Sequence, residues 1–297
     1  MARLARKPSL EGRLEPNLFR SGPSHKSIIE LYGEEGVGKT QMLIHLLAKC
    51  ILPNEWNGLP VDGLGISAIF VDSNFDMSLI RLAGVLESRI VGCIERNGET
   101  AAELSVADED VEALVKQCLG RLYLVRCKSS SQLYITLDYL ENLLCNKPDI
   151  GVLMIDSISA FYWIDKYAAG DSVQAQQRNT THIAEIVERL AGTHNLVVFT
   201  TKSVLYQKTR HRYRWPSDVH PNSPDVRTHS GSLPEFSIEH CEYLCKAWTK
   251  IVTQRLMFSK ESPPSSEQQQ RFSVWFDTSS NKTKLYFTIE KNGILFL

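Results

Sequence analysis

The chain has 297 residues and a formal net charge of −1, with 43% hydrophobic and 23% charged residues. These values are ordinary for a soluble globular protein with a sizeable core, so the fold needs no disulfide or metal to hold it together. They argue against a wholly basic nucleic-acid binder, although a local basic patch is compatible with them, and the sequence has no apolar run of about 18 residues that would predict a membrane span.

The N-terminal part of the chain is predicted to consist of an arm and the start of a core. Residues 1–25 are polar and contain several prolines and glycines, which predicts a flexible arm. The core is predicted to occupy residues 26–297. It begins with a buried strand over residues 27–32, followed by a glycine-rich loop and a helix over residues 40–52.

Strands and helices then alternate along the chain. Four more apolar strands are predicted, at residues 67–72, 122–125, 151–156 and 195–200. Helices are predicted to begin near Asp76, to run from Leu133 to Leu144, and to begin after Asp171 or Ser172. This alternation predicts an α/β fold with a mostly parallel twisted sheet and helices on both of its faces.

The C-terminal part has a different pattern. Residues 203–235 are polar and are predicted to form a long mobile loop. Short strands follow, at residues 255–258, 272–276, 284–289 and 294–296. Residues 259–271, rich in serine, proline and glutamine, are predicted to form a hairpin tip. The parallel core is therefore expected to carry a β-rich C-terminal extension.

The loop between the first strand and the first helix has a composition that suits phosphate binding. It reads Gly33-Glu34-Glu35-Gly36-Val37-Gly38-Lys39-Thr40. The glycines let the backbone turn its N–H groups toward a phosphate, Lys39 supplies a positive charge, and the helix N-terminus adds its positive dipole end. The hydroxyl of Thr40 suits Mg²⁺. These eight residues are therefore the predicted binding site for ATP with Mg²⁺.

An acidic residue stands where a magnesium site needs one. Asp156 ends the apolar strand 151–155, a position from which a carboxylate reaches Mg²⁺ beside a phosphate loop. The alternative is an ordinary strand-end cap, because Ser157 follows. Since the loop and the acidic strand end occur together, Thr40 and Asp156 are the predicted magnesium residues.

Several segments resemble the RecA family of recombinases. Residues 153–162, Leu-Met-Ile-Asp-Ser-Ile-Ser-Ala-Phe-Tyr, resemble the strand-and-switch segment of that family, and Phe70-Val71-Asp72-Ser73 resembles its second strand. Gly293-Ile294 resembles its C-terminal hairpin, so the resemblance extends from about residue 26 to the end. The segments that most resemble the eukaryotic paralogues of these recombinases are residues 15–19, 49–53, 159–165 and 243–248.

The resemblance implies a RecA-like P-loop ATPase core that acts in homologous-recombination repair of DNA double-strand breaks. It implies membership of a hetero-oligomeric paralogue complex that helps load or stabilise the recombinase on single-stranded DNA. The implied partners are other recombinase paralogues, the recombinase filament, and single-stranded or branched DNA. The implied location is the nucleus.

The sequence departs from the family at two catalytic positions. The water-activating Glu that the family places two residues after Asp72 is replaced by Asn74, and an amide cannot accept a proton as a carboxylate does. The Gln that senses the γ-phosphate is replaced at Lys202-Ser203. Asp76 lies close to the missing acid, but its spacing suits a helix cap better.

These departures predict weak ATP hydrolysis or none, with ATP and Mg²⁺ serving as a structural brace. No catalytic residue is therefore assigned, and Asn74 and Asp76 are named as the residues near the water-activating position. The alternative is an active enzyme, either a DNA-stimulated ATPase that uses Asp76 or a partner residue, or a P-loop kinase.

Two segments are candidates for contact with DNA. Residues 163–170 match the first DNA-facing loop of the family, and residues 208–215 lie in the place of its second DNA-facing loop. The side chains in the second segment that combine positive charge with aromatic rings are Lys208, Arg210, Arg212, Tyr213, Arg214 and Trp215. Such a combination suits phosphate contact and base stacking on single strands. A solvated loop with an accidental basic bias is an equally open alternative.

Overall fold

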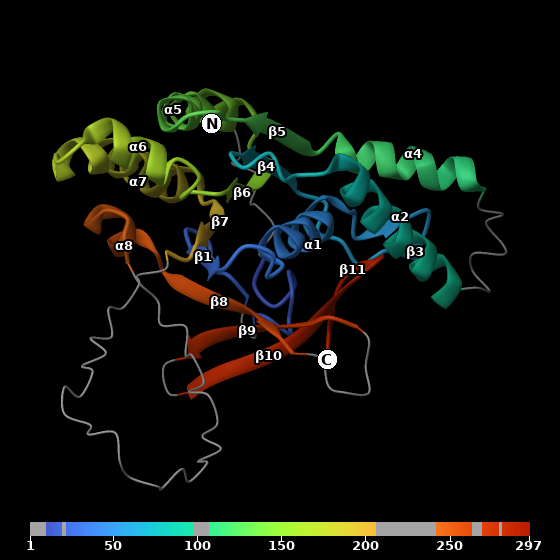
Figure 1. Ribbon diagram of the computed structural model, residues 1–297. Coiled ribbons are helices and arrows are strands. Elements are labelled where there is room, and N and C mark those ends of the chain that lie inside the picture. Colours follow the sequence, from blue (N-terminus) through green and yellow to red (C-terminus); the bar gives the residue numbers. More distant parts are fainter. Residues whose placement is uncertain (1–9, 20–21, 98–106, 206–241, 263–268, 279–280) are drawn as a thin grey trace, which may run out of the picture.

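The computed structural model describes residues 10–19, 22–97, 107–205, 242–262, 269–278 and 281–297. They form a nine-stranded sheet with helices packed on it, and a two-stranded sheet of β2 (Glu55–Trp56) and β3 (Leu59–Pro60) (Figure 1). The order across the large sheet is β11 (Gly293–Phe296), β10 (Asn281–Glu290), β9 (Arg271–Thr278), β8 (Gln254–Glu261), β1 (Ile28–Gly33), β7 (Val197–Ser203), β6 (Ile150–Asp156), β4 (Ser67–Asp72) and β5 (Leu122–Arg126).

The sheet has a parallel part and an antiparallel part. Strands β5, β4, β6, β7, β1 and β8 pair in parallel. Strands β9, β10 and β11 continue the sheet from β8 in antiparallel hairpins. The predicted α/β fold, with a mostly parallel sheet and a β-rich C-terminal extension, is therefore confirmed.

Each central strand contributes side chains to two hydrophobic cores, one on each face of the sheet. In β4, Ala68 and Phe70 belong to one core, whereas Ile69 and Val71 belong to the other. Successive side chains of a strand point to opposite faces, so a strand that is covered on both faces must be apolar throughout. This is why the predicted strands read as continuous apolar runs.

The helices cover both faces of the sheet. The core that contains Phe70 also contains side chains of α1 (Lys39–Ile51), α2 (Leu79–Arg96) and α4 (Asp108–Leu119). The opposite core contains side chains of α5 (Ser130–Asn146), α7 (Val173–His194) and α8 (Lys246–Ile251), with α6 (Tyr162–Ala169) beside them (Figure 1). In the described part of the chain, no helix has the length and apolar character that crossing a membrane requires.

Three helices differ from the sequence-based expectations. Helices α4 and α8 were not predicted, and Asp108, Glu109 and Asp110 lie in the first turn of α4. Carboxylates are favourable there because they face the positive end of the helix dipole. The segment matched to a DNA-facing loop forms α6, which ends at Gly170. That loop prediction is wrong because this stretch contains neither glycine nor proline before Gly170.

The described part of the N-terminal arm packs on the core. Leu10, Leu14, Leu18 and Phe19 are all buried in the core that contains α1. The three leucines are spaced by four residues, which places them on one side of a turning chain. The predicted flexible arm over residues 1–25 is therefore wrong for these positions, and residues 1–9 lie outside the described residues.

A buried histidine joins the N-terminal segment to the C-terminal hairpin. His45 Nε2 lies 2.9 Å from Oε2 of Glu15. Nδ1 accepts hydrogen bonds from the backbone N–H of Ile294 at 2.9 Å and from Arg89 Nη2 at 2.7 Å. Because Nδ1 accepts, the proton of the neutral ring lies on Nε2 and is donated to Glu15. Burial, together with the charge of Arg89, lowers the pKa of His45.

We predict that this histidine makes folding stability depend on pH. The unfolded chain binds a proton at His45 below about pH 6.5, whereas the folded protein resists protonation. The free energy of unfolding should therefore fall as the pH drops from that value toward the lowered pKa of the folded state. In His45→Gln this loss should be smaller, as measured by urea unfolding across pH. His182→Gln, at an exposed position of α7, is the control, and identical pH profiles for His45→Gln and the wild type would contradict the assignment.

Candidate functional site

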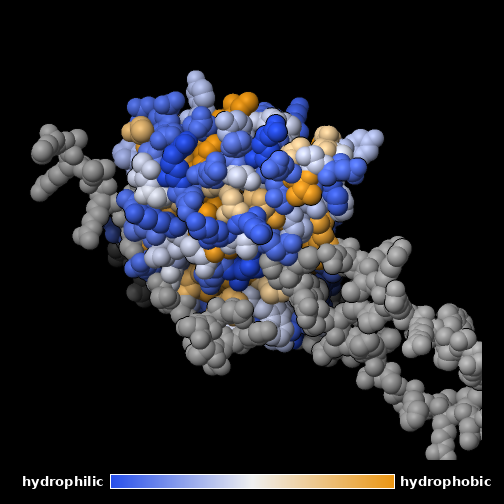
Figure 2. Space-filling model, turned by 90° about the vertical axis from the view of Figure 1, so that its left-hand side faces the viewer, coloured by the Kyte–Doolittle hydropathy of each residue, from blue (hydrophilic) through white to orange (hydrophobic). Residues whose placement is uncertain are grey.

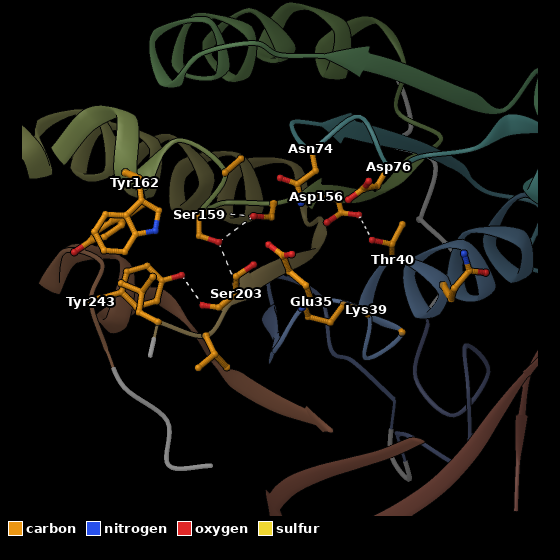
Figure 3. Close-up of a pocket in the computed structure, with 18 of the residues that line it drawn as sticks. Glu35, Lys39, Thr40, Asn74, Asp76, Asp156, Ser159, Tyr162, Ser203 and Tyr243 are labelled. Atoms are coloured by element: carbon orange, nitrogen blue, oxygen red, sulfur yellow. Dashed lines mark hydrogen bonds between the residues drawn. The ribbon is translucent and has the colours of Figure 1, made fainter. Parts of the chain in front are cut away.

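A cavity of about 810 Å³ opens at the carboxyl ends of β1, β4, β6 and β7. This is the edge of an open α/β sheet at which ligands bind. Figure 3 shows Lys39 and Glu35 on one side of the cavity and Thr40, Asn74, Asp76 and Asp156 on the other. The predicted phosphate loop, the predicted magnesium residues and the position of the missing glutamate therefore lie around one space.

The backbone of the loop needs its glycines. Gly36 and Gly38 have φ angles of 73° and 91°, which favour glycine. A Cβ atom on Gly33 would lie 2.6 Å from the carbonyl oxygen of Phe258, and one on Gly38 would lie 3.3 Å from Cδ1 of Ile289. Helix α1 begins directly after Gly38 and has no side-chain cap. Its first N–H groups are therefore available to an anion.

Lys39 lies over its own loop. Its Nζ donates to the carbonyl oxygens of Gly33, at 2.7 Å, and of Glu34. Burial lowers the pKa of Lys39 to about 8, although the carboxylates of Asp156 and Glu35 oppose the shift. A phosphate in the loop would add negative charge beside this ammonium group and favour its charged form.

The two predicted magnesium residues contact each other. Thr40 Oγ1 donates to Asp156 Oδ2 at 2.7 Å, and Thr201 donates to the other carboxylate oxygen (Figure 3 shows the first bond). Burial raises the pKa of Asp156, and the nearby charge of Asp76 adds to this. A hydroxyl and a carboxylate are oxygen ligands that fit Mg²⁺, which usually completes its coordination with phosphate and water. In the described ranges no three or more His, Cys, Asp or Glu residues are grouped as a metal site, so the metal would need the phosphates of a nucleotide.

Asp76 does not cap a helix. Helix α2 begins at Leu79, and its cap is Ser78, whose hydroxyl accepts from the N–H of Arg81 at 3.2 Å. The helix-cap interpretation of Asp76 is therefore wrong. Asp76 and Asn74 both line the cavity (Figure 3). Burial and the neighbouring carboxylates of Asp72 and Glu35 raise the pKa of Asp76.

Lys202 points away from the cavity. Its side chain is fully buried, with Nζ 3.4 Å from Glu30 and 3.0 Å from Glu242. Glu30 also accepts from Trp248 Nε1 at 2.8 Å and from Arg255 Nε at 2.6 Å. The side chain at the place of the family's γ-phosphate-sensing Gln thus belongs to a buried ionic network, which we call the Glu30 network: Glu30, Lys202, Glu242, Trp248 and Arg255.

An aromatic wall completes the cavity. Tyr162 of α6 packs edge-on against Tyr243, with ring centroids 4.7 Å apart. The hydroxyl of Tyr243 donates to the carbonyl oxygen of Ser203 at 2.6 Å (Figure 3), and Trp163 also lines the cavity. The sequence reasoning missed Tyr243 and Ile289 as cavity residues, because no local pattern marks a side chain that arrives from a distant segment.

The predicted DNA contacts of the second segment lie outside the described residues. They are Lys208, Arg210, Arg212, Tyr213, Arg214 and Trp215. The first segment, residues 163–170, is described: Trp163 and Ile164 are 61% and 64% exposed, whereas Phe161, which lies just before the segment, is buried. The apolar residues at positions 161–164 are therefore divided between core and surface.

We predict that the Glu30 network stabilises the fold strongly. Lys202→Met removes one partner and leaves buried carboxylates with less compensation, which should lower the free energy of unfolding by about 3 kcal/mol. The matched control is Lys260→Met on β8, an exposed position, where a change within about 0.5 kcal/mol is expected. Equal effects of the two substitutions in urea unfolding would contradict a stabilising role for the network.

Comparison with known proteins agrees with the fold and the site. The parallel sheet, the glycine-rich loop before α1 and the facing Asp156 define a RecA-like P-loop protein, and residues 23–203 match the AAA domain family. The mouse (Mus musculus) DNA repair protein XRCC2 is 35% identical over 299 residues, which cover 100% of this chain and 95% of the mouse protein. The chain therefore belongs to the XRCC2 family of DNA repair proteins.

Two less similar relatives extend the comparison. The XRCC2 homolog of Arabidopsis thaliana is 27% identical over 286 residues, covering 86% of this chain and 74% of the plant protein. The DNA repair and recombination protein RadA of Haloquadratum walsbyi is 27% identical over 195 residues, covering 63% of this chain and 54% of RadA. The resemblance to recombinase paralogues is thereby confirmed.

Proposed function

We propose that this protein acts in homologous-recombination repair of DNA double-strand breaks in the nucleus. It is a subunit of a paralogue complex that helps load or stabilise the recombinase on single-stranded DNA. The observation that carries the proposal is full-length similarity to XRCC2 proteins on a RecA-like fold with Asn74 at the water-activating position. A phosphate loop without the hydrolytic carboxylate suits a supporting subunit better than a motor.

The nucleotide has a structural role in this proposal. The loop Gly33–Thr40 binds the phosphates of ATP, and Thr40 with Asp156 holds the accompanying Mg²⁺. Magnesium bound there neutralises phosphate charge. The cavity joins the phosphate loop to α6 and Tyr243, so a bound nucleotide would brace elements that come from distant parts of the chain.

The surface around α6 is the proposed contact region for DNA or for a paralogue. Trp163, Ile164, Tyr167 and Val173 are 61%, 64%, 92% and 62% exposed. Figure 2 views the molecule from the side that lies at the left of Figure 1, where α6 is drawn, and shows a mainly hydrophilic surface with separate apolar patches. Clustered exposed apolar side chains favour an interaction site. The basic segment 208–215 is proposed as a DNA contact on its sequence pattern alone.

A second function, DNA-stimulated ATP hydrolysis, is favoured by one observation. Asp76 faces the cavity next to Asn74 instead of capping α2. Its carboxylate, with a raised pKa, could orient water in place of the missing Glu. This possibility requires the partner complex or DNA to complete the site.

We predict that Lys39→Ala lowers the affinity for Mg-ATP at least about tenfold, because it removes the ammonium group that meets the phosphates. Wild-type affinity should also fall as the pH rises above about 8, where free Lys39 loses its proton. Isothermal titration calorimetry measures both effects. Lys49→Ala, on the same helix but paired with Asp62, is the control and should bind normally. Unchanged binding by Lys39→Ala would show that the phosphate site lies elsewhere.

The function itself is tested by purifying the tagged chain from cells and identifying the accompanying proteins by mass spectrometry. Stoichiometric recovery of recombinase paralogues, with no phosphate release in the presence of ATP and single-stranded DNA, is the expected result. Phosphate release by the complex that is lost in Asp76→Asn would support the second function instead. A lone chain that turns over ATP without partners would overturn the proposal of a supporting subunit.

A further inference from the structure

Helices α2 and α4 enclose a groove on the side of the molecule away from α6 (Figure 1). The inner side chains of both helices belong to one hydrophobic core. The groove has a volume of about 470 Å³. None of the residues that line it also lines the nucleotide cavity, so the two are separate sites.

The floor of the groove is apolar. It consists of Ala83 and Val91 from α2 and of Val111 and Val115 from α4. The two valines of α4 are buried, whereas Val91 is 39% exposed. Residues four positions apart lie on the same side of a helix, so each helix presents a row of side chains to the groove. From position 83 to position 91 the floor extends over about 12 Å, which suits about two turns of another helix.

The rim of the groove is acidic. Glu87, Asp108 and Glu112 line it and are exposed, and none of the described residues that line the groove is basic. Lys116 Nζ lies 2.7 Å from Glu112, and both side chains of this pair are exposed. Within the described part of the chain, the carboxylates of Glu87 and Asp108 have no hydrogen bond or ion pair. The rim therefore offers negative charge to a ligand.

The acidic rim is not explained by the capping of α4. The cap is made by Asp110, whose carboxylate accepts from the N–H of Ala107 at 3.0 Å. Asp108 lines the groove instead, together with Glu112 four residues later. Like charges at this spacing destabilise an isolated helix. They become favourable when a cation lies between or beside them.

The charge of the rim restricts which ligand fits the groove. Nucleic acids and anionic membrane surfaces are negatively charged and would be repelled. The segment that joins the two helices, residues 98–106, lies outside the described residues, and its sequence contains two glutamates and no lysine or arginine. The chemistry that matches both floor and rim is a protein segment with basic side chains beside apolar ones.

We infer that the groove between α2 and α4 binds a basic amphipathic helix of a partner protein. The apolar side chains of that helix lie on the valine floor, and lysine or arginine side chains on its flanks pair with Glu87 and Asp108. Recognition of this kind places an apolar helix face in a hydrophobic groove. Because the groove shares no lining residue with the nucleotide cavity, the partner and a nucleotide occupy different sites.

The experiment measures the binding of labelled helical peptides of about four turns to the purified full chain by fluorescence anisotropy. The lysine peptide has leucine along one face and lysine on both flanks, and the glutamate peptide has glutamate in place of every lysine. The lysine peptide should bind at least about tenfold more tightly than the glutamate peptide. A peptide with the composition of the lysine peptide, but with its leucines spread around the helix, should also bind at least about tenfold more weakly.

Three variants locate the binding. Glu87→Lys combined with Asp108→Lys should reverse the preference, so that the glutamate peptide binds more tightly. The matched control, Glu109→Lys combined with Glu188→Lys, makes the same charge change at exposed positions that do not line the groove and should keep the wild-type preference. Val91→Ser removes part of the floor at a half-exposed position and should weaken the lysine peptide about fivefold. Thermal unfolding checks that all three variants are folded.

Two kinds of result would overturn the inference. If both double variants lose lysine-peptide binding equally, the peptide responds to net charge and not to the groove. If the chain forms a concentration-dependent dimer in sedimentation that only the Glu87→Lys and Asp108→Lys variant abolishes, the groove belongs to a second copy of the chain instead of a basic partner. A photo-crosslinker at the centre of the lysine peptide should react with α2 and α4, and reaction confined to other helices would refute the proposed site.

Discussion

The carboxylate of Glu30, buried in the middle of β1, is the charge around which the centre of the sheet is arranged. A buried carboxylate without partners is strongly destabilising, so each strand beside β1 supplies a cation to it. Lys202 comes from β7 and Arg255 from β8, and Trp248 of α8 donates a hydrogen bond. Glu242 then compensates the same two cations. The order β8-β1-β7 is thereby reinforced by charge as well as by backbone pairing.

This arrangement has a consequence for the nucleotide cavity. A lysine held by Glu30 and Glu242 cannot also reach a phosphate, so the end of β7 contributes the Ser203 backbone and side chain to the cavity instead of a positive charge. The cradle does not depend on Lys202, because it is built from backbone turns at Gly36 and Gly38 and from Lys39. The residues that suit phosphate binding are therefore present in the cavity, whereas the residue at the family's γ-phosphate-sensing position belongs to the Glu30 network.

The features that could be predicted from the sequence were those that lie within a single segment of the chain. The phosphate loop is eight consecutive residues, and Asp156 ends an unmistakable apolar strand, so both were identified and the structure brings them together. Asp76 was assigned to a helix cap because Asp and Ser are both good caps, and only the structure shows that Ser78 takes this role. Helix α6 was mistaken for a loop because resemblance outweighed its local helix preference. The Glu30 network was invisible, since its members lie far apart in the chain.

The C-terminal strands show most clearly how distant segments complete the site. Phe287 and Ile289 of β10 pack against Gly38, so close that a Cβ atom there would lie 3.3 Å from Ile289. Helix α2 holds the turn after β10 in place: Arg81 donates to the carbonyl oxygen of Lys291 at 2.9 Å, and Arg89 to that of Asn292 at 3.3 Å. The hairpin β10–β11 thus packs against the phosphate loop through β10, and hydrogen bonds from α2 hold the turn of the hairpin in place. Through Ile289 the β-rich extension therefore lines the nucleotide cavity, and the phosphate loop packs against residues at the far end of the chain.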